Sequence, residues 1–150
     1  MKKSKRLNVI VELNVKNEKK ALEALGEIQR QKQDAEKQLE HLKDYQQGYK
    51  DQYQSIGVTG ANIKQLLEFR AFVSKLSMAI EQQKQVVAEL DEKVSSTQTH
   101  WEKQHQKTKS MEKVRGAAVK EEAKEQDKRE QSEQDDRASR VGRNSGAENA

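Results

Sequence analysis

LLEFRAFVSKLSMAIEQQKQVVAELDEKV, residues 66–94, has apolar side chains at alternating steps of three and four residues. This spacing aligns them in one column along an α-helix and is typical of a coiled-coil seam. Gln83 interrupts the column with a polar side chain. The seam positions are Leu66, Phe69, Val73, Leu76, Ile80, Gln83, Val87, Leu90 and Val94.

A second, shorter apolar column flanks this seam. Phe72, Ala79 and Val86 recur every seven residues, at a position where a self-contained coiled coil usually carries charge. Because the first column already accounts for the pairing of helices, we interpret the second as a surface for another molecule.

Another seam precedes this one in the chain. Asn14, Glu18 and Lys32 interrupt it, and polar seam residues of this kind lower stability but fix the register. The fraction of apolar residues at the seam positions is well above the 32% hydrophobic content of the whole chain, so chance does not explain the alternation. Its positions are Leu7, Val11, Asn14, Glu18, Ala21, Leu25, Ile28, Lys32, Ala35, Leu39, Leu42, Gln46, Tyr49 and Tyr53.

A short link, QSIGVTGAN at residues 54–62, separates the two seams. Asn62 followed by Gln65 is typical of a capping box that begins a helix. So short a link lets one molecule bury both seams only if its helices fold back, which predicts an all-α, antiparallel two-helix coiled-coil hairpin. The predicted segments are a basic tail (1–6), a helix (about 7–54), a turn (about 55–61), a helix (about 62–119) and a charged, partly helical to disordered tail (120–150).

Toward the C-terminus the apolar alternation weakens. Trp101 still lies on the seam and is expected in the core, but around Val114 and Val119 the phase is expected to slip, as at a stutter. Farther on, only charge pairs such as Glu125 with Arg129 favour helix, so we expect the end of the chain to fray.

The composition excludes several classes of protein. With 36% charged residues and no proline, the chain suits long helices better than a globular core or a disordered chain. It has no cysteine for disulfides or thiolate metal sites, and no run reaches the roughly 18 apolar residues of a membrane span. We expect a soluble, cytoplasmic protein whose contact with membranes is through partners.

The motifs do not support an enzyme, a cofactor or a metal site. His100 and His105 are five residues apart, whereas two metal ligands on one helical face are four apart. A two-helix fold also offers no enclosed pocket for catalysis. Nucleic-acid binding, an alternative suggested by the formal net charge of +4, lacks a basic stripe with interleaved aromatic residues.

The flank of the first predicted helix carries Tyr45 and, one heptad earlier, Gln38. If the hairpin is centred near residues 57–58, Tyr45 stands opposite Phe72 and Gln38 opposite Ala79, so the two flanks meet. An alternative hypothesis is that these side chains only broaden the hairpin core. The candidate partner-binding patch comprises Gln38, Leu42, Tyr45, Tyr49, Phe72, Leu76, Ala79 and Gln83.

Two segments, KQLEHLKDYQQGY (37–49) and FRAFVSKLSMAIEQQ (69–83), resemble the FliJ family of the bacterial flagellar type III export apparatus. The resemblance rests on Leu-x-x-Tyr-x-x-x-Tyr in the first segment and Phe-x-x-x-Leu-x-x-Ala-Ile in the second, and it spans roughly residues 7–115. Gln83 stands where some members of the family carry histidine. The resemblance implies partner-binding roles for Gln38, Leu42, Tyr45, Tyr49, Phe72, Leu76 and Ala79.

The same resemblance implies a non-enzymatic stalk or adaptor, similar to the central stalk of rotary ATPases. The implied partners are the export ATPase FliI, whose ring assembly it promotes, the export gate protein FlhA, FliH and export chaperones. The implied location is the cytoplasmic face of the inner membrane. A generic coiled-coil adaptor and the equivalent stalk of a virulence secretion system remain alternatives.

Overall fold

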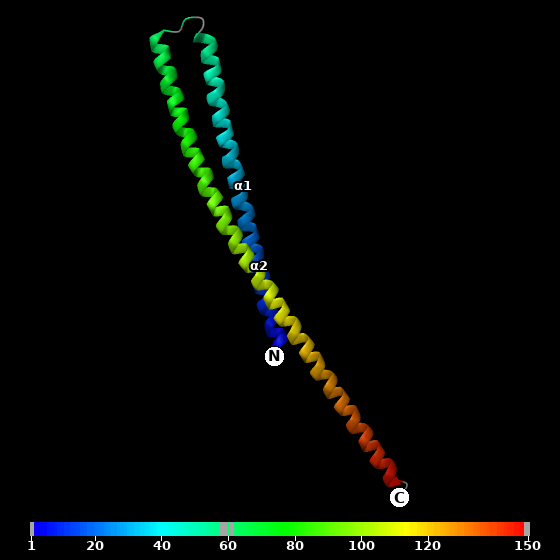
Figure 1. Cartoon of the computed structure of the whole chain (residues 1–150). Helices are drawn as coiled ribbons and strands as arrows, with labels where there is room; N and C mark the ends of the chain where they lie inside the picture. Colours follow the sequence, from blue (N-terminus) through cyan, green and yellow to red (C-terminus); the bar gives the residue numbers. More distant parts are fainter. Residues whose placement is uncertain (1, 58–59, 61, 149–150) are drawn as a thin grey trace. The chain divides into compact units, whose positions relative to one another are not determined.

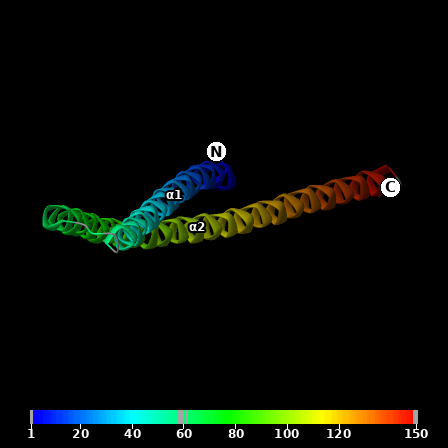
Figure 2. The same ribbon diagram turned by 90° about the horizontal axis from the view of Figure 1, so that it is seen from above.

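Two long helices make up the fold. The computed structural model describes residues 2–57, 60 and 62–148, in which α1 spans Lys3–Gly57 and α2 spans Ile63–Glu148. Both are continuous, and they pack antiparallel as a hairpin, which confirms the predicted fold (Figure 1 and Figure 2). The hairpin divides into two compact units that each contain part of both helices. Unit 1 is Met1–Glu18 with Gln104–Ala150, and unit 2 is Lys19–Lys103.

The predicted capping box begins α2. The backbone N–H of Gln65 donates to Asn62 Oδ1 at 2.8 Å, and the N–H of Asn62 donates to Gln65 Oε1 at 3.3 Å. Gly60 has φ of 101°, a left-handed conformation that glycine adopts without steric cost. Residues 55–57 of the predicted turn belong to α1, and residues 58, 59 and 61 lie outside the described part of the chain.

The predicted seams form the interface between the helices of unit 2. Every α1 seam position of this unit is buried or half-buried, Ala21 and Ala35 most completely. On α2, Leu76 and Ile80 are 8% and 6% exposed, whereas Leu66 at the start of the helix is 37% exposed. Burial of one stripe on each helix therefore holds this unit together, as the alternation predicted.

In unit 1 the α2 seam continues without a change of phase, so the predicted stutter is wrong. Val114 and Val119 are 45% and 50% exposed, while Ala118 is buried. Arg115 occupies the seam instead, because its aliphatic stem can cover apolar surface while its guanidinium donates to Asn8 Oδ1 at 2.9 Å. A search for apolar residues alone overlooks an arginine in this role.

The predicted tails are helical where the structure describes them. α1 begins at Lys3, inside the predicted basic tail, and α2 continues through the segment that was expected to fray. Every side chain described between residues 123 and 146 is exposed, so no core stabilises this part. Local factors favour the helix, namely the lack of proline and bonds such as Gln126 Nε2 to Glu130 Oε1 at 3.2 Å.

Candidate functional site

The structure brings the predicted patch residues together within unit 2, from both helices. The predicted meeting of the two flanks is confirmed, since Tyr45 and Phe72 make an edge-to-face contact with ring centroids 6.1 Å apart and planes at 77°. Gln83 Nε2 also donates to Gln38 Oε1 at 3.4 Å. Tyr45 thus lies beside Phe72, and Gln38 beside Gln83, along one edge of the unit. The patch comprises Gln38, Leu42, Tyr45 and Tyr49 on α1 and Phe72, Leu76, Ala79 and Gln83 on α2.

Further aromatic rings extend this patch toward the end of the hairpin that holds the link. Tyr49 contacts Phe72 and Phe69, with centroids 4.6 Å and 5.3 Å away, and Tyr53 stacks on Phe69 at 3.6 Å. Phe69 and Tyr53 are seam residues nearer the link and are not among the predicted site residues. The cross-helix ring contacts show that both belong to the same aromatic cluster, which consists of Tyr45, Tyr49, Tyr53, Phe69 and Phe72.

The patch has a buried part and an exposed part. Leu76 is 8% exposed and belongs to the core, and Tyr49 is half-buried. Tyr45 is 57% exposed, and Gln38 is exposed beside it. A ring held on one side by Phe72 and open on the other offers apolar area and a phenolic hydroxyl at little cost in side-chain entropy. Tyrosines in protein interfaces commonly serve as anchors of this kind.

Two seam glutamines make hydrogen bonds across the helix pair of unit 2. Gln83 Nε2 donates to the carbonyl of Ala35 at 3.0 Å. Gln46 Nε2 donates to Ser77 Oγ at 2.7 Å and to the carbonyl of Val73 at 3.2 Å. These bonds satisfy amide groups in the interface and help to set the register of the helices. Gln83 therefore has a structural role at the margin of the patch.

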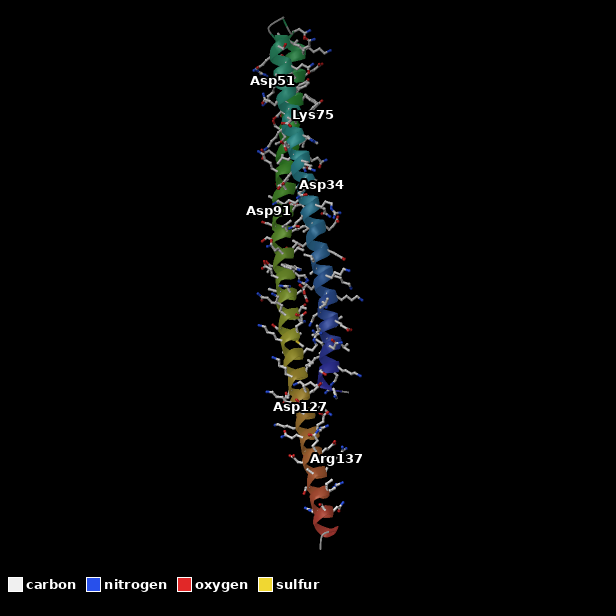
Figure 3. All side chains as sticks on the ribbon, turned by 90° about the vertical axis from the view of Figure 1, so that its right-hand side faces the viewer. Asp34, Asp51, Lys75, Asp91, Asp127 and Arg137 are labelled. Atoms are coloured by element: carbon white, nitrogen blue, oxygen red, sulfur yellow. The ribbon has the colours of Figure 1, made fainter. Side chains whose placement is uncertain are left out.

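The opposite edge of unit 2 is charged. Lys32 Nζ donates to Asp91 Oδ1 at 2.8 Å and lies 3.7 Å from Glu36 Oε1. The hydrogen bond to Asp91 raises the pKa of Lys32. Figure 3 shows Asp91 on the side of the helix pair away from Asp34 and Lys75. One edge of the unit is thus linked by an ion pair, whereas the other presents aromatic rings.

In unit 1 the interface between the helices buries polar residues beside apolar ones such as Val11 and Ala118. Glu18 Oε1 lies 2.5 Å from His105 Nδ1, and this hydrogen bond lowers the pKa of Glu18. Asn14 and Thr108 are each 3% exposed, and Thr108 Oγ1 donates to the carbonyl of Gln104 at 3.0 Å. Buried polar side chains stabilise a fold less than apolar ones of similar size. These residues therefore contribute more to the register in which the two helices pair than to the stability of the pair.

A carboxylate of α2 caps the first turn of α1. The backbone N–H and the hydroxyl of Ser4 donate to the two carboxylate oxygens of Glu122, at 3.0 Å and 2.6 Å. These bonds lower the pKa of Glu122. A carboxylate at a helix N-terminus satisfies free N–H groups and offsets the positive end of the helix dipole. This cap helps to stabilise the helical structure of residues 3–6, which the sequence predicts to be a tail.

The described residues contain no group of three or more His, Cys, Asp or Glu side chains that could hold a metal ion. Neither helix, over the part described, has a stretch long and apolar enough to cross a membrane. His100 and His105 both lie on α2, and His105 takes part in the contact between the helices.

Together, fold and site define a class of protein, a two-helix coiled-coil hairpin with an aromatic face on one edge. A family model described as flagellar FliJ protein matches residues 2–147. The flagellar FliJ protein of Escherichia coli (strain K12) is 30% identical over 101 residues, which cover 67% of this chain and 69% of that protein. The chain belongs to the FliJ family and is a non-catalytic component of the flagellar export apparatus. No solved structure gives a significant match.

The family match confirms the resemblance inferred from the two quoted segments. It also favours flagellar export over the alternatives of a generic adaptor and a virulence-secretion stalk. The partner-binding roles of the individual patch residues stay predictions.

Proposed function

We propose that this protein is a stalk or adaptor that binds the export ATPase ring and the export gate and promotes their coupling. Its contacts differ between states of a partner, so its binding shifts the populations of those states without any covalent chemistry. The proposed partners are FliI, with FliH, on the ATPase side and FlhA on the gate side, together with chaperones that deliver export substrates. Such a protein works in the cytoplasm at the inner membrane and touches it only through partners.

One observation carries the proposal, namely the exposed ring of Tyr45 supported by Phe72. Tyr45 is 57% exposed, although its neighbours in the aromatic cluster are partly buried in the interface between the helices. Large rings that are fixed in position yet open to solvent are the usual anchors of protein–protein interfaces. Because the seam buries other residues, loss of the Tyr45 ring should affect binding more than folding.

The matched pair Phe72→Glu and Met78→Glu tests the gate part of this proposal. Both residues lie on α2, but Phe72 is in the patch, whereas Met78 is 63% exposed and off the seam. Isothermal titration against the cytoplasmic part of FlhA should show at least a tenfold loss for Phe72→Glu, as expected for an anchor, and little change for Met78→Glu. Circular dichroism would check that both variants stay helical.

Equal affinity of the two variants for FlhA would refute the assignment of the patch. Strong loss of helicity in Phe72→Glu would favour the alternative hypothesis that the flank only broadens the core. Tyr45→Glu then decides between the two, because its exposed ring contributes less to the interface between the helices. A pull-down against FliI tests the ATPase part, and a wild-type chain that binds neither FliI nor FlhA would refute the proposed function as a whole.

A further inference from the structure

The aromatic patch lies within a longer strip without charge on one edge of unit 2. Over residues 31–52 of α1 and 65–86 of α2, one flanking column of the coiled-coil repeat on each helix carries only uncharged side chains, and in an antiparallel pair these two columns face each other. The contact of Tyr45 with Phe72 confirms that they do so here. At about 1.5 Å per residue, the strip is roughly 32 Å long. The uncharged strip consists of Gln31, Gln38, Tyr45 and Gln52 on α1 and Gln65, Phe72, Ala79 and Val86 on α2.

The pairing of the two helices does not explain why the side chains of this strip are uncharged. Flanking positions of a two-helix coiled coil usually carry charge, and on the opposite edge the flanking Asp91 pairs with Lys32 of the α1 seam. In the strip, Tyr45 and Val86 are 57% and 41% exposed, and the glutamines are exposed as well. A helix pair with an uncharged stripe wider than its seam has the surface needed to contact a further helix.

Negative charge borders the strip. The next positions outward carry the carboxylates of Asp34, Glu68 and Glu89 and the ammonium of Lys75, and all four side chains are exposed. Asp34 and Lys75 lie along the same edge of the helix pair in Figure 3. This local excess of carboxylates stands out in a chain whose formal net charge is +4. An uncharged floor with an acidic rim favours a ligand with an uncharged face and cationic flanks.

We propose that the uncharged strip seats one α-helix of a partner protein, about 20 residues long, with an uncharged contact face and Lys or Arg on its flanks. The length follows from the roughly 32 Å of the strip and the rise of an α-helix. Tyr45 and Val86 provide apolar contacts, the exposed glutamines hydrogen-bond to polar groups of that face, and the basic flanks reach the acidic rim. This inference rests on the proposed function, because it takes the strip as the surface that binds the partner.

Two synthetic peptides of 21 residues test this chemistry with the full-length protein. Both carry the same helical face of Ala, Leu and Gln, and their flanks are Lys in one and Glu in the other. Fluorescence anisotropy at low salt should show the Lys-flanked peptide binding at least tenfold more tightly, with affinity falling as salt rises. Circular dichroism of the mixture should show added helix on binding.

Charge-reversal variants locate the binding site. Asp34→Lys and Glu89→Lys should each weaken binding of the Lys-flanked peptide about three- to tenfold, in line with the effect of charges at the rim of an interface. Asp44→Lys is the matched control, because it makes the same charge change on an exposed position of α1 that faces away from both edges. Val86→Glu tests the floor of the strip and should also weaken binding.

Equal binding of the two peptides, or binding of neither, would overturn the inference. So would an equal loss of affinity in Asp34→Lys and Asp44→Lys, which would indicate general electrostatic attraction. The outcome is separable from that of the proposed function. Binding of FlhA without a preference between the peptides refutes this inference alone, and a clear preference without binding of FlhA or FliI refutes the proposed function alone.

Discussion

Tyr45→Ala and Leu76→Ala should separate binding from folding. The Tyr45 ring is 57% exposed and meets Phe72 by an edge contact, so its removal should lower the free energy of unfolding by about 0.5 kcal/mol, the low end for an aromatic pair. Leu76 is 8% exposed, and its truncation should cost about 2 kcal/mol, the low end for a buried leucine, because a thin two-helix core can partly close over the gap.

For binding, we expect Tyr45→Ala to have the larger effect and Leu76→Ala the smaller one. If Tyr45 anchors a partner, its truncation should cost about 2 kcal/mol of binding free energy, which is roughly a 30-fold loss of affinity. Urea unfolding followed by circular dichroism measures the first quantity, and isothermal titration with the cytoplasmic part of FlhA measures the second. Leu22→Ala is a suitable control, because Leu22 is 52% exposed on the other edge of α1.

Two results would refute this reasoning. If Tyr45→Ala lowers the urea midpoint as much as Leu76→Ala, the Tyr45 ring belongs to the core and the surface interpretation fails. If Tyr45→Ala changes the affinity for FlhA less than threefold, the ring is exposed but does not anchor this partner.

Three further predictions concern polar residues. Gln83→Leu should raise the free energy of unfolding by about 1 kcal/mol in urea titrations, because the gain in buried apolar area outweighs the lost hydrogen bonds to Ala35 and Gln38; destabilisation would show that the Gln83 amide is indispensable. Glu122→Gln should speed amide hydrogen exchange in the first turn of α1, where Glu122 accepts from Ser4, and unchanged exchange would contradict the cap. The hydrogen bond to His105 lowers the pKa of Glu18 in the folded protein. Ionised Glu18 therefore stabilises the fold at pH values above its pKa in the unfolded chain, about 4.3, and this stabilisation is lost as the pH falls through the folded pKa. Hydrogen exchange in unit 1 should therefore depend on acid pH more strongly in the wild type than in Glu18→Gln, and equal dependence would exclude this contribution.

The amino-acid sequence alone was enough to predict the helices, the seams and the hairpin. Coiled-coil periodicity is a local property, and an apolar stripe has to be buried whatever the details of its partner, so Leu76 and Ile80 could be placed in the core in advance. The capping box of Asn62 and Gln65 is equally local. The patch could be predicted in outline for the same reason, since a column that recurs every seven residues lies on one edge of a helix.

Contacts between the helices depended on their register, which neither helix specifies by itself. Only the folded pair placed Phe69 in the aromatic cluster, Arg115 in the seam and Glu122 over the first turn of α1. Each of these three residues contacts a residue of the other helix that is more than ten positions away in the sequence. The sequence pattern therefore determined which face of each helix is buried and that Tyr45 meets Phe72. Packing decided the other contacts, because cross-helix bonds such as that of Gln46 with Ser77 form at one register.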